Sequence, residues 1–207
     1  MSLRLVTDAS AEPISLADIK THLRLSTVST VEDDYLNRKI KAARRKAESL
    51  TKRCCLPQTW KLTLDGFPGD EIVLMRAPLS SVATDVVITY LDAASGNSTT
   101  LSTSYYGIDY EAEPGRIYLK DGYDWPETYT DRQAVTVQFV AGFKINTAVT
   151  PSTDTTPEEI EDWIMMRAAA AYEWREPLVD GKVEVQELPR SYMDGLLDEY
   201  CLIDVRP

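Results

Sequence analysis

The side chains that most often carry catalysis are scarce in this chain and are not grouped. The single histidine, His22, has no second His or Cys at metal-ligand spacing, and no serine lies in a nucleophile-elbow pattern. The glycines form neither a G-x-G-x-x-G nor a P-loop pattern. The acidic pairs Asp33-Asp34 and Glu158-Glu159 stand where helices are expected to start, and capping accounts for them. We therefore expect no enzyme, no catalytic residue and no cofactor.

Metal binding has equally little support. Three acids alternate along the end of a predicted strand: Asp109, Glu111 and Glu113. They could bind Ca²⁺, but the loop-glycine pattern of a calcium site is missing. The cysteines Cys54, Cys55 and Cys201 form neither a C-x-x-C motif nor a disulfide framework. We therefore expect no metal site and interpret the cysteines as small buried hydrophobic residues.

Aromatic residues gather in the second half of the predicted β region. They are Tyr105, Tyr106, Tyr110, Tyr118, Tyr123, Trp125 and Tyr129. Such a cluster is typical of a carbohydrate-binding platform, and also of sheet-facing rings that pack against a hairpin. We favour packing and keep a β-sandwich binding module of the carbohydrate type as an alternative.

The charge is distributed unevenly along the chain. Of the total of −11, residues 38–53 contribute eight bases and one acid, a net of +7, so the remainder is −18. From Asp154 onward fourteen acids and five bases give −9. No aromatic residue interleaves with the bases, and the acidic remainder would repel phosphate, so we do not expect DNA binding. The segment is predicted instead to contact an acidic partner, with these candidate interface residues: Arg38, Lys41, Arg44 and Arg45.

The first 57 residues are predicted to be helical. Ser15 is a good N-cap with Asp18 at its capping-box position, so a first helix is expected to start there. A second, longer helix is expected to follow Asp33 or Asp34, and Pro57 prevents its continuation. Its apolar residues are spaced 4, 3, 4 and 3 apart, which predicts a narrow contact seam: Leu36, Ile40, Ala43, Ala47 and Leu50.

From Gln58 to about Phe143 the hydrophobic period changes to two, as in strands. Short runs are separated by turn-forming segments such as Ser95-Gly96-Asn97 and Asp121-Gly122. Five to seven strands are expected, without a helix of crossover length between them. This pattern favours an antiparallel sandwich or a small barrel.

The C-terminal part returns to helix. Asn146–Thr156 is a linker, Pro157 opens a third helix that runs to about Arg175, and a last short helix is expected near Arg190–Tyr200. We predict an α+β fold in which the two ends form a small helical core around an inserted antiparallel β subdomain. The predicted parts are residues 1–57 (N-terminal helices), 58–145 (β insertion) and 146–207 (linker and C-terminal helices).

The order of short motifs along the chain is more specific than any one of them. The motifs are Leu3–Thr7, Glu12–Leu16, Asp33–Leu36, Gln58–Trp60, Phe67–Pro68, Ala77–Val82, Pro114–Ile117, Val137–Phe143, Leu188–Pro189 and Leu196–Tyr200. Together they resemble the head–tail connector (adaptor) family of phages and prophages, in its long form with a β-rich insertion. The resemblance departs at Cys201, where such endings often carry an Arg.

The resemblance implies a structural virion protein that joins the portal to the tail or stopper. It implies a ring of about a dozen subunits with head-to-tail contacts. Double-stranded DNA would pass through without specific binding, and the location would be the virion neck after synthesis in the host cytoplasm. The opening residues lack a secretory signal and no apolar run approaches a span, so no membrane is expected. A tail-completion or stopper protein is an alternative, and the free protein could be a monomer.

Overall fold

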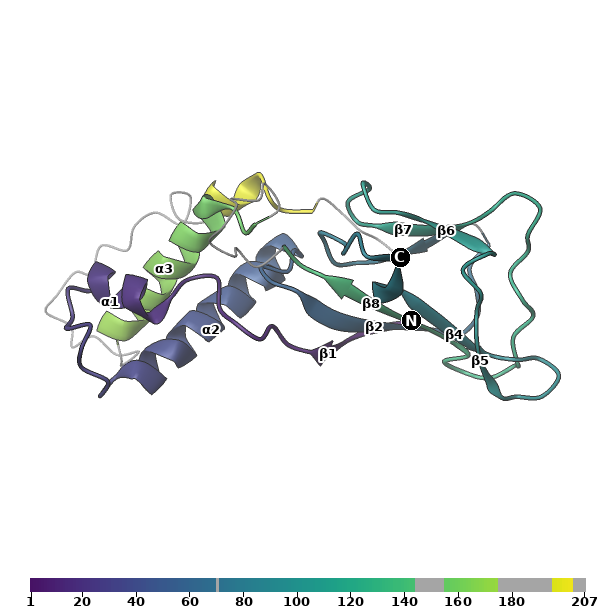
Figure 1. The fold of residues 1–207 in the computed structure, drawn as a ribbon, viewed down its shortest axis with the longest axis horizontal. Coiled ribbons are helices and arrows are strands. Elements are labelled where there is room, and N and C mark those ends of the chain that lie inside the picture. The colour runs from purple at the N-terminus through teal and green to yellow at the C-terminus, as the bar shows by residue number, and fades with distance from the viewer. Residues whose placement is uncertain (70, 144–154, 175–194, 203–207) are drawn as a thin grey trace, which may run out of the picture. The chain divides into compact units, whose positions relative to one another are not determined.

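The computed structural model describes residues 1–69, 71–143, 155–174 and 195–202. Its chain divides into two compact units, each formed by segments that are distant in sequence. The β-rich unit comprises Met1–Ser10, Leu56–Lys144 and Leu202–Pro207. The helical unit comprises Ala11–Cys55 and Ile145–Cys201. The helical unit therefore combines a segment from before the β insertion with a segment from after it (Figure 1).

The helical unit contains α1 (Leu16–His22), α2 (Asp33–Thr51) and α3 (Glu158–Glu173), and residues 195–198 are helical too. The predicted capping box is confirmed, because Ser15 Oγ accepts from the Asp18 N–H at 3.1 Å and the Asp18 carboxylate accepts from the Ser15 N–H at 3.3 Å. Glu32 is the N-cap of α2, so Asp33 and Asp34 lie one and two positions inside the first turn, where acids favour the helix dipole.

The β-rich unit contains two antiparallel sheets. The larger has the strand order β1 (Ser2–Thr7), β2 (Gln58–Leu64), β8 (Val135–Ala141), β4 (Val87–Leu91) and β5 (Ser98–Thr100). The smaller has the order β3 (Glu71–Val73), β7 (Arg116–Leu119) and β6 (Tyr106–Asp109), and a 3-10 turn, η1 (Ala83–Asp85), precedes β4. In the part of the chain that the structure describes, β1 and β5 are free edges, so the sheet is not a closed barrel. The α+β fold with a sandwich-like insertion is confirmed.

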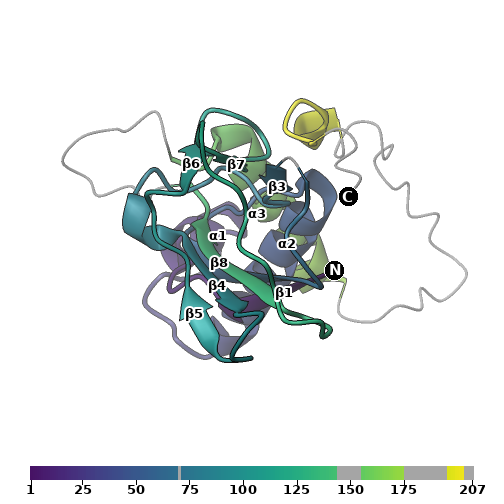
Figure 2. The same ribbon diagram turned by 90° about the vertical axis from the view of Figure 1, so that its right-hand side faces the viewer.

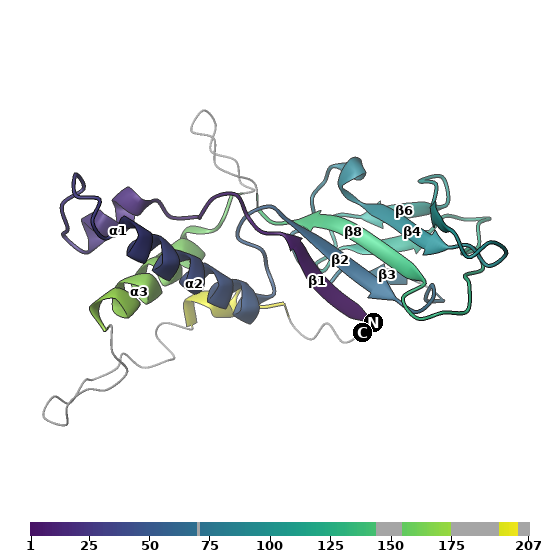
Figure 3. The same cartoon turned by 90° about the horizontal axis from the view of Figure 1, so that it is seen from below.

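The first and last strands of the insertion lie side by side. β2 and β8 pair from Gln58↔Ala141 to Leu64↔Val135. Figure 3 shows β8 between β2 and β4, and Figure 2 shows β8 beside β4. Gly142 follows β8 with φ of +141°, and a Cβ there would lie 2.2 Å from the Leu56 carbonyl oxygen. The close backbone approach thus requires glycine. The long β excursion begins and ends at neighbouring points, as an insertion must.

The structure corrects the prediction for the first residues of the chain. Residues 1–57 were expected to be helical, but residues 1–10 belong to the β-rich unit. Leu3 pairs with Leu62 and Leu5 pairs with Trp60, which makes β1 an edge strand beside β2. A six-residue run carries little period-two signal, and its pairing partner lies more than fifty residues away. Only the sheet determines that this segment is a strand.

Candidate assembly interface

The basic helix α2 is held against α3 along the predicted seam. Leu36, Ile40, Ala43 and Ala47 are buried, and they face the buried Ile160, Ile164 and Ala168 of α3. The helices before and after the β insertion therefore pack together through the narrow apolar stripes that their spacing indicated. Leu50, the last predicted seam position, is 38% exposed because α2 ends one residue later, at Thr51. Lys52 then adopts the left-handed conformation that terminates many helices.

Arg44 lies inside the helical unit and not on its surface, which corrects its predicted place among the interface residues. Its side chain is fully buried. The Arg44 Nε donates to Glu12 Oε2 at 2.7 Å, and Nη1 donates to Glu48 Oε1 at 3.0 Å and Oε2 at 3.1 Å. The physical reason is geometric. Arg44 follows Ala43 on the seam side of α2, where a charge is retained only if it is paired and hydrogen-bonded.

The Arg44 ion cluster extends to the backbone beyond α2. Glu48 Oε1 also accepts from the Cys55 N–H at 3.1 Å, and the hydroxyl of Thr156 donates to the Cys55 carbonyl at 2.5 Å. Burial lowers the pKa of Arg44, but its hydrogen bonds and attraction to Glu12 and Glu48 outweigh this and raise the pKa above its usual range. Arg44 therefore stays cationic and fixes segments on both sides of α2.

Sequence reasoning missed the two carboxylates of this cluster. Glu48 lies four residues after Arg44, the spacing of a helical ion pair, and this was a readable signal. Glu12 is 32 residues away along the chain, and nothing in the sequence indicates the pairing. A second buried base was missed in the same way: Lys20 Nζ lies 2.5 Å from Asp33 Oδ1 and donates to the Ser29 carbonyl at 2.6 Å.

The other three predicted interface residues lie on the outer side of α2. Arg38 and Arg45 are exposed and Lys41 is half-buried. Arg38 Nε donates to the Asp34 carbonyl at 3.3 Å, and its guanidinium lies 5.9 Å from the centre of the Tyr35 ring. Lys39 Nζ lies 4.8 Å from the same ring. The Tyr35 ring near the start of α2 thus helps to position the cationic side chains of Arg38 and Lys39.

The histidine and the acidic residues considered above for catalysis or metal binding do not form a catalytic or metal-binding cluster in the described residues. His22 is exposed at the end of α1. Asp109 Oδ1 accepts from the backbone N–H groups of Glu111 and Ala112, both at 3.0 Å, so its carboxylate closes a turn. Over the residues that the structure describes, no group of three or more His, Cys, Asp or Glu side chains could hold a metal ion.

Cys54, Cys55 and Cys201 are all free thiols. Cys54 and Cys55 are buried free thiols, and burial raises the pKa of Cys55 well above its ordinary value. Cys201 is half-buried, with Sγ 3.7 Å from the Leu50 carbonyl. Among the described helices, none is long and apolar enough to cross a membrane.

The aromatic cluster is divided between packing and exposure. The rings of Phe67 and Trp125 stack with centroids 4.7 Å apart and Tyr90 packs against Phe67 at 5.8 Å. Tyr118 lies across Gly107, where a Cβ would meet its ring at 2.5 Å. Trp125 and Tyr118 of the predicted cluster thus make specific packing contacts, whereas Tyr118, Tyr123 and Tyr129 are 46%, 43% and 48% exposed.

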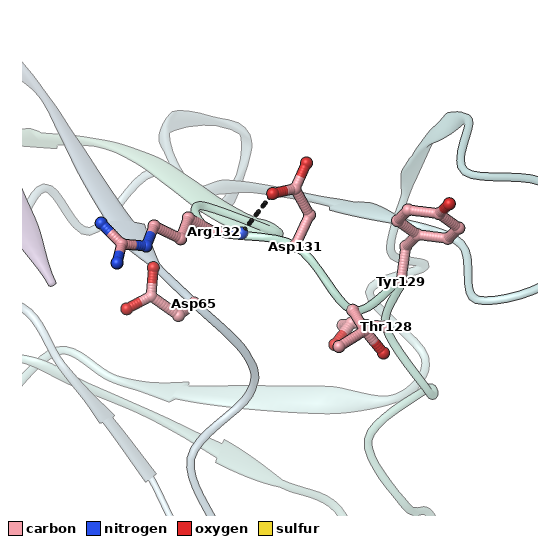
Figure 4. A pocket seen from close by; sticks show the side chains of 6 residues that line it. Asp65, Thr128, Tyr129, Asp131 and Arg132 are labelled. Carbon is pink, nitrogen blue, oxygen red and sulfur yellow. Dashed lines mark hydrogen bonds between the residues drawn. The ribbon is translucent and has the colours of Figure 1, made fainter.

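An open depression lies at the edge of the β-rich unit. A volume of about 460 Å³ is lined by Asp65, Thr128, Tyr129, Thr130, Asp131 and Arg132 (Figure 4). Asp65 also accepts from the Gln133 N–H at 3.0 Å. Its lining is polar and mostly exposed, whereas small-molecule sites are usually enclosed and apolar.

A comparison with protein families finds a match in the N-terminal part of the chain. Residues 13–113 match the family described as Phage gp6-like head-tail connector protein. Over these residues the chain is similar to this family. The matched region contains α1, α2 and the strands β2 to β6, so it includes the basic helix and part of the β-rich unit. No curated protein matches the chain.

Solved structures share the fold of this chain over its full length. A chain from the neck of an empty gene transfer agent (GTA) particle, computed with C6 symmetry, has 24% identity and a TM-score of 0.76. A chain from the virion of a native GTA particle has 22% identity and a TM-score of 0.74. A third, from the neck of a native GTA particle computed with C12 symmetry, has 22% identity and a TM-score of 0.71. Each alignment covers 100% of this chain and 98% of the other.

Proposed function

We propose that this chain is a head–tail connector, an adaptor subunit in the neck of a phage-like particle. The observation that carries the proposal is the family match over residues 13–113, which contains the basic helix and most of the β insertion. It is supported by the likeness of the whole fold to chains from particle necks and a virion. Its role is to supply binding surfaces in a fixed geometry and not to catalyse a reaction.

The proposed assembly is a ring in the virion neck, bound to the portal on one side and to the tail or stopper on the other. The C6 and C12 symmetries of the related neck structures support a ring, because closed rotational symmetry repeats one contact around an axis. A net charge of −11 suits a conduit, since it disfavours tight contact with the phosphates of passing DNA.

A deletion in the host that produces the particle tests this function. Removing the gene should give DNA-filled or empty heads without tails, and the gene supplied in trans should restore tailed particles. In cryo-electron microscopy of restored particles, density of this fold should appear between portal and tail. Normal tailed particles without the gene would contradict the proposal. The purified chain should bind isolated portal in a mass measurement, whereas binding to the tail tip would favour another virion role.

A further inference from the structure

The exposed charges of the helical unit are sorted onto two sides of the α2–α3 pair. At 3.6 residues per turn, Arg38, Lys41 and Arg45 lie opposite the seam of α2. We name these three residues the basic face. On α3, Glu158 and Asp162 lie opposite the buried Ile160, Ile164 and Ala168 by the same spacing. Because the helices share the seam, their outer faces point away from one another (Figure 3).

The outer side of α3 carries a concentrated negative charge, joined by one residue of α1. We name Asp18, Glu158, Glu161 and Asp162 the acidic face. Burial, together with the charges of Glu158, Asp162 and Asp18, raises the pKa of Glu161 to about 7. The acids are thus close enough to repel one another, and a cationic surface placed over them would relieve that repulsion.

We propose that the basic face of one copy binds the acidic face of a second copy; this inference rests on the connector function proposed above. Two different faces on opposite sides of one helix pair make a head-to-tail contact, which continues from copy to copy until rotation closes it. Opposite charge mainly steers the encounter and sets the register, so reversal on one side should be harmful and reversal on both should be tolerated.

Charge indicates that the basic face binds a second copy of the chain and not DNA. The basic face is one short stripe on a chain whose net charge is −11, so a duplex would meet long-range repulsion around that stripe. Each copy of the chain carries an acidic face whose residues have a matching helical spacing. The charge complementarity is therefore supplied within the assembly itself.

Three variants test the contact in full-length protein: Arg38→Glu with Arg45→Glu, Glu158→Lys with Asp162→Lys, and all four changes together. The matched control is Lys61→Glu with Arg132→Glu, two exposed bases of the β-rich unit. Each variant is supplied in trans to the gene deletion, and tailed particles are counted by electron microscopy. Circular dichroism of each purified chain verifies that it is folded.

Each reversal alone should lower the tailed-particle count about tenfold or more, and the fourfold variant should return it to within about threefold of the wild type. The control should stay within the same range. A fourfold variant no better than the worse single reversal overturns the contact, as do harmless single reversals. Salt-sensitive retention of double-stranded DNA by the wild type, lost in Arg38→Glu with Arg45→Glu, would overturn it in favour of DNA contact. Failure of the deletion itself to remove tails would instead refute the connector function.

Discussion

At the scale of single residues, one buried cation holds distant segments of the helical unit together. Arg44 contacts Glu12 before α1 and Glu48 on α2, and Glu48 in turn accepts from the Cys55 N–H beyond α2. Removing one member of a buried ion cluster is costly because the remaining charges are left without partners in a low-dielectric interior. Arg44 thus stabilises the helical unit by neutralising the carboxylates of Glu12 and Glu48.

Arg44→Met should destabilise the protein by about 3–5 kcal/mol, because two carboxylates then lose their shared partner inside the unit. Arg45→Met is the matched control, since the neighbouring side chain is exposed and its loss should change stability by no more than about 0.5 kcal/mol. Urea unfolding followed by circular dichroism measures both. Equal stability of the two variants would show that the buried cluster is not structural.

Glu161 should make the stability of the helical unit depend on pH. Its folded pKa of about 7 lies above its ordinary 4.5, so the folded state binds the proton more tightly. Stability is therefore expected to fall as pH rises from about 4.5 to about 7. Glu161→Gln removes this dependence. At pH 8 it should raise the free energy of unfolding by roughly 1 kcal/mol after allowance for solvent screening, which corresponds to a melting temperature higher by a few degrees. At pH 4 the melting temperature should not change.

Glu159→Gln provides a control of opposite sign. The pKa of the Glu159 carboxyl is lowered by a backbone hydrogen bond and by the hydroxyl of Tyr200, which donates to it at 2.9 Å. Its charged form is therefore favoured by folding, and the glutamine variant should lose stability at neutral pH. If both variants shift the melting temperature in the same direction, the assigned causes are wrong.

At the scale of elements, the seam between α2 and α3 joins the helices before and after the β insertion. Ile40 is 1% exposed and Ile164 is fully buried, so each helix covers the other along its apolar stripe. The stripe on α2 is narrow because bases and Ser, Asn and Ala residues occupy the rest of its surface. Neither helix alone buries this surface, so α2 and α3 are expected to unfold together.

Ile40→Asp should unfold the helical unit, because it places an unpaired charge in the middle of the seam. The loss is expected to reach about 4 kcal/mol or more. Ala42→Asp adds the same charge at an exposed position of the same helix and should be nearly neutral. Thermal melting followed by far-ultraviolet circular dichroism, which reports helix content, measures the stability of both variants. A cooperative Ile40→Asp variant with unchanged melting would refute the seam.

At the scale of the whole molecule, the β-rich unit is an excursion from the helical unit. We propose that the helical unit folds without it. The ends that would be joined are adjacent, because the Thr156 hydroxyl donates to the Cys55 carbonyl at 2.5 Å. A short Gly/Ser bridge can therefore connect residue 55 to residue 155 without altering the helices.

A chain of residues 11–55, this bridge and residues 155–202 should retain a helical circular-dichroism spectrum and a cooperative melting transition. Residues 1–10 are omitted because β1 loses its partner β2. The same chain with Ile40→Asp serves as an unfolded reference. Absence of helical signal from the shortened chain would show that the helical unit depends on the insertion.

The sequence by itself determined the local features of this protein. Ser15 and Asp18 stand three apart, which is enough to form a capping box. The spacing of Ile40, Ala43 and Ala47 is enough to define the seam of α2. Alternation around Leu62 and Val137 likewise predicted the β insertion, because strand and helix periods involve only neighbours along the chain.

Only the tertiary structure decided which distant groups meet. Arg38, Arg44 and Arg45 are alike in sequence, yet Glu12, 32 residues from Arg44, makes one of them an interior cation. Residues 2–7 become a strand only because β2 offers an edge. Pairings of this kind depend on how the chain folds back on itself, and no local period or composition encodes them.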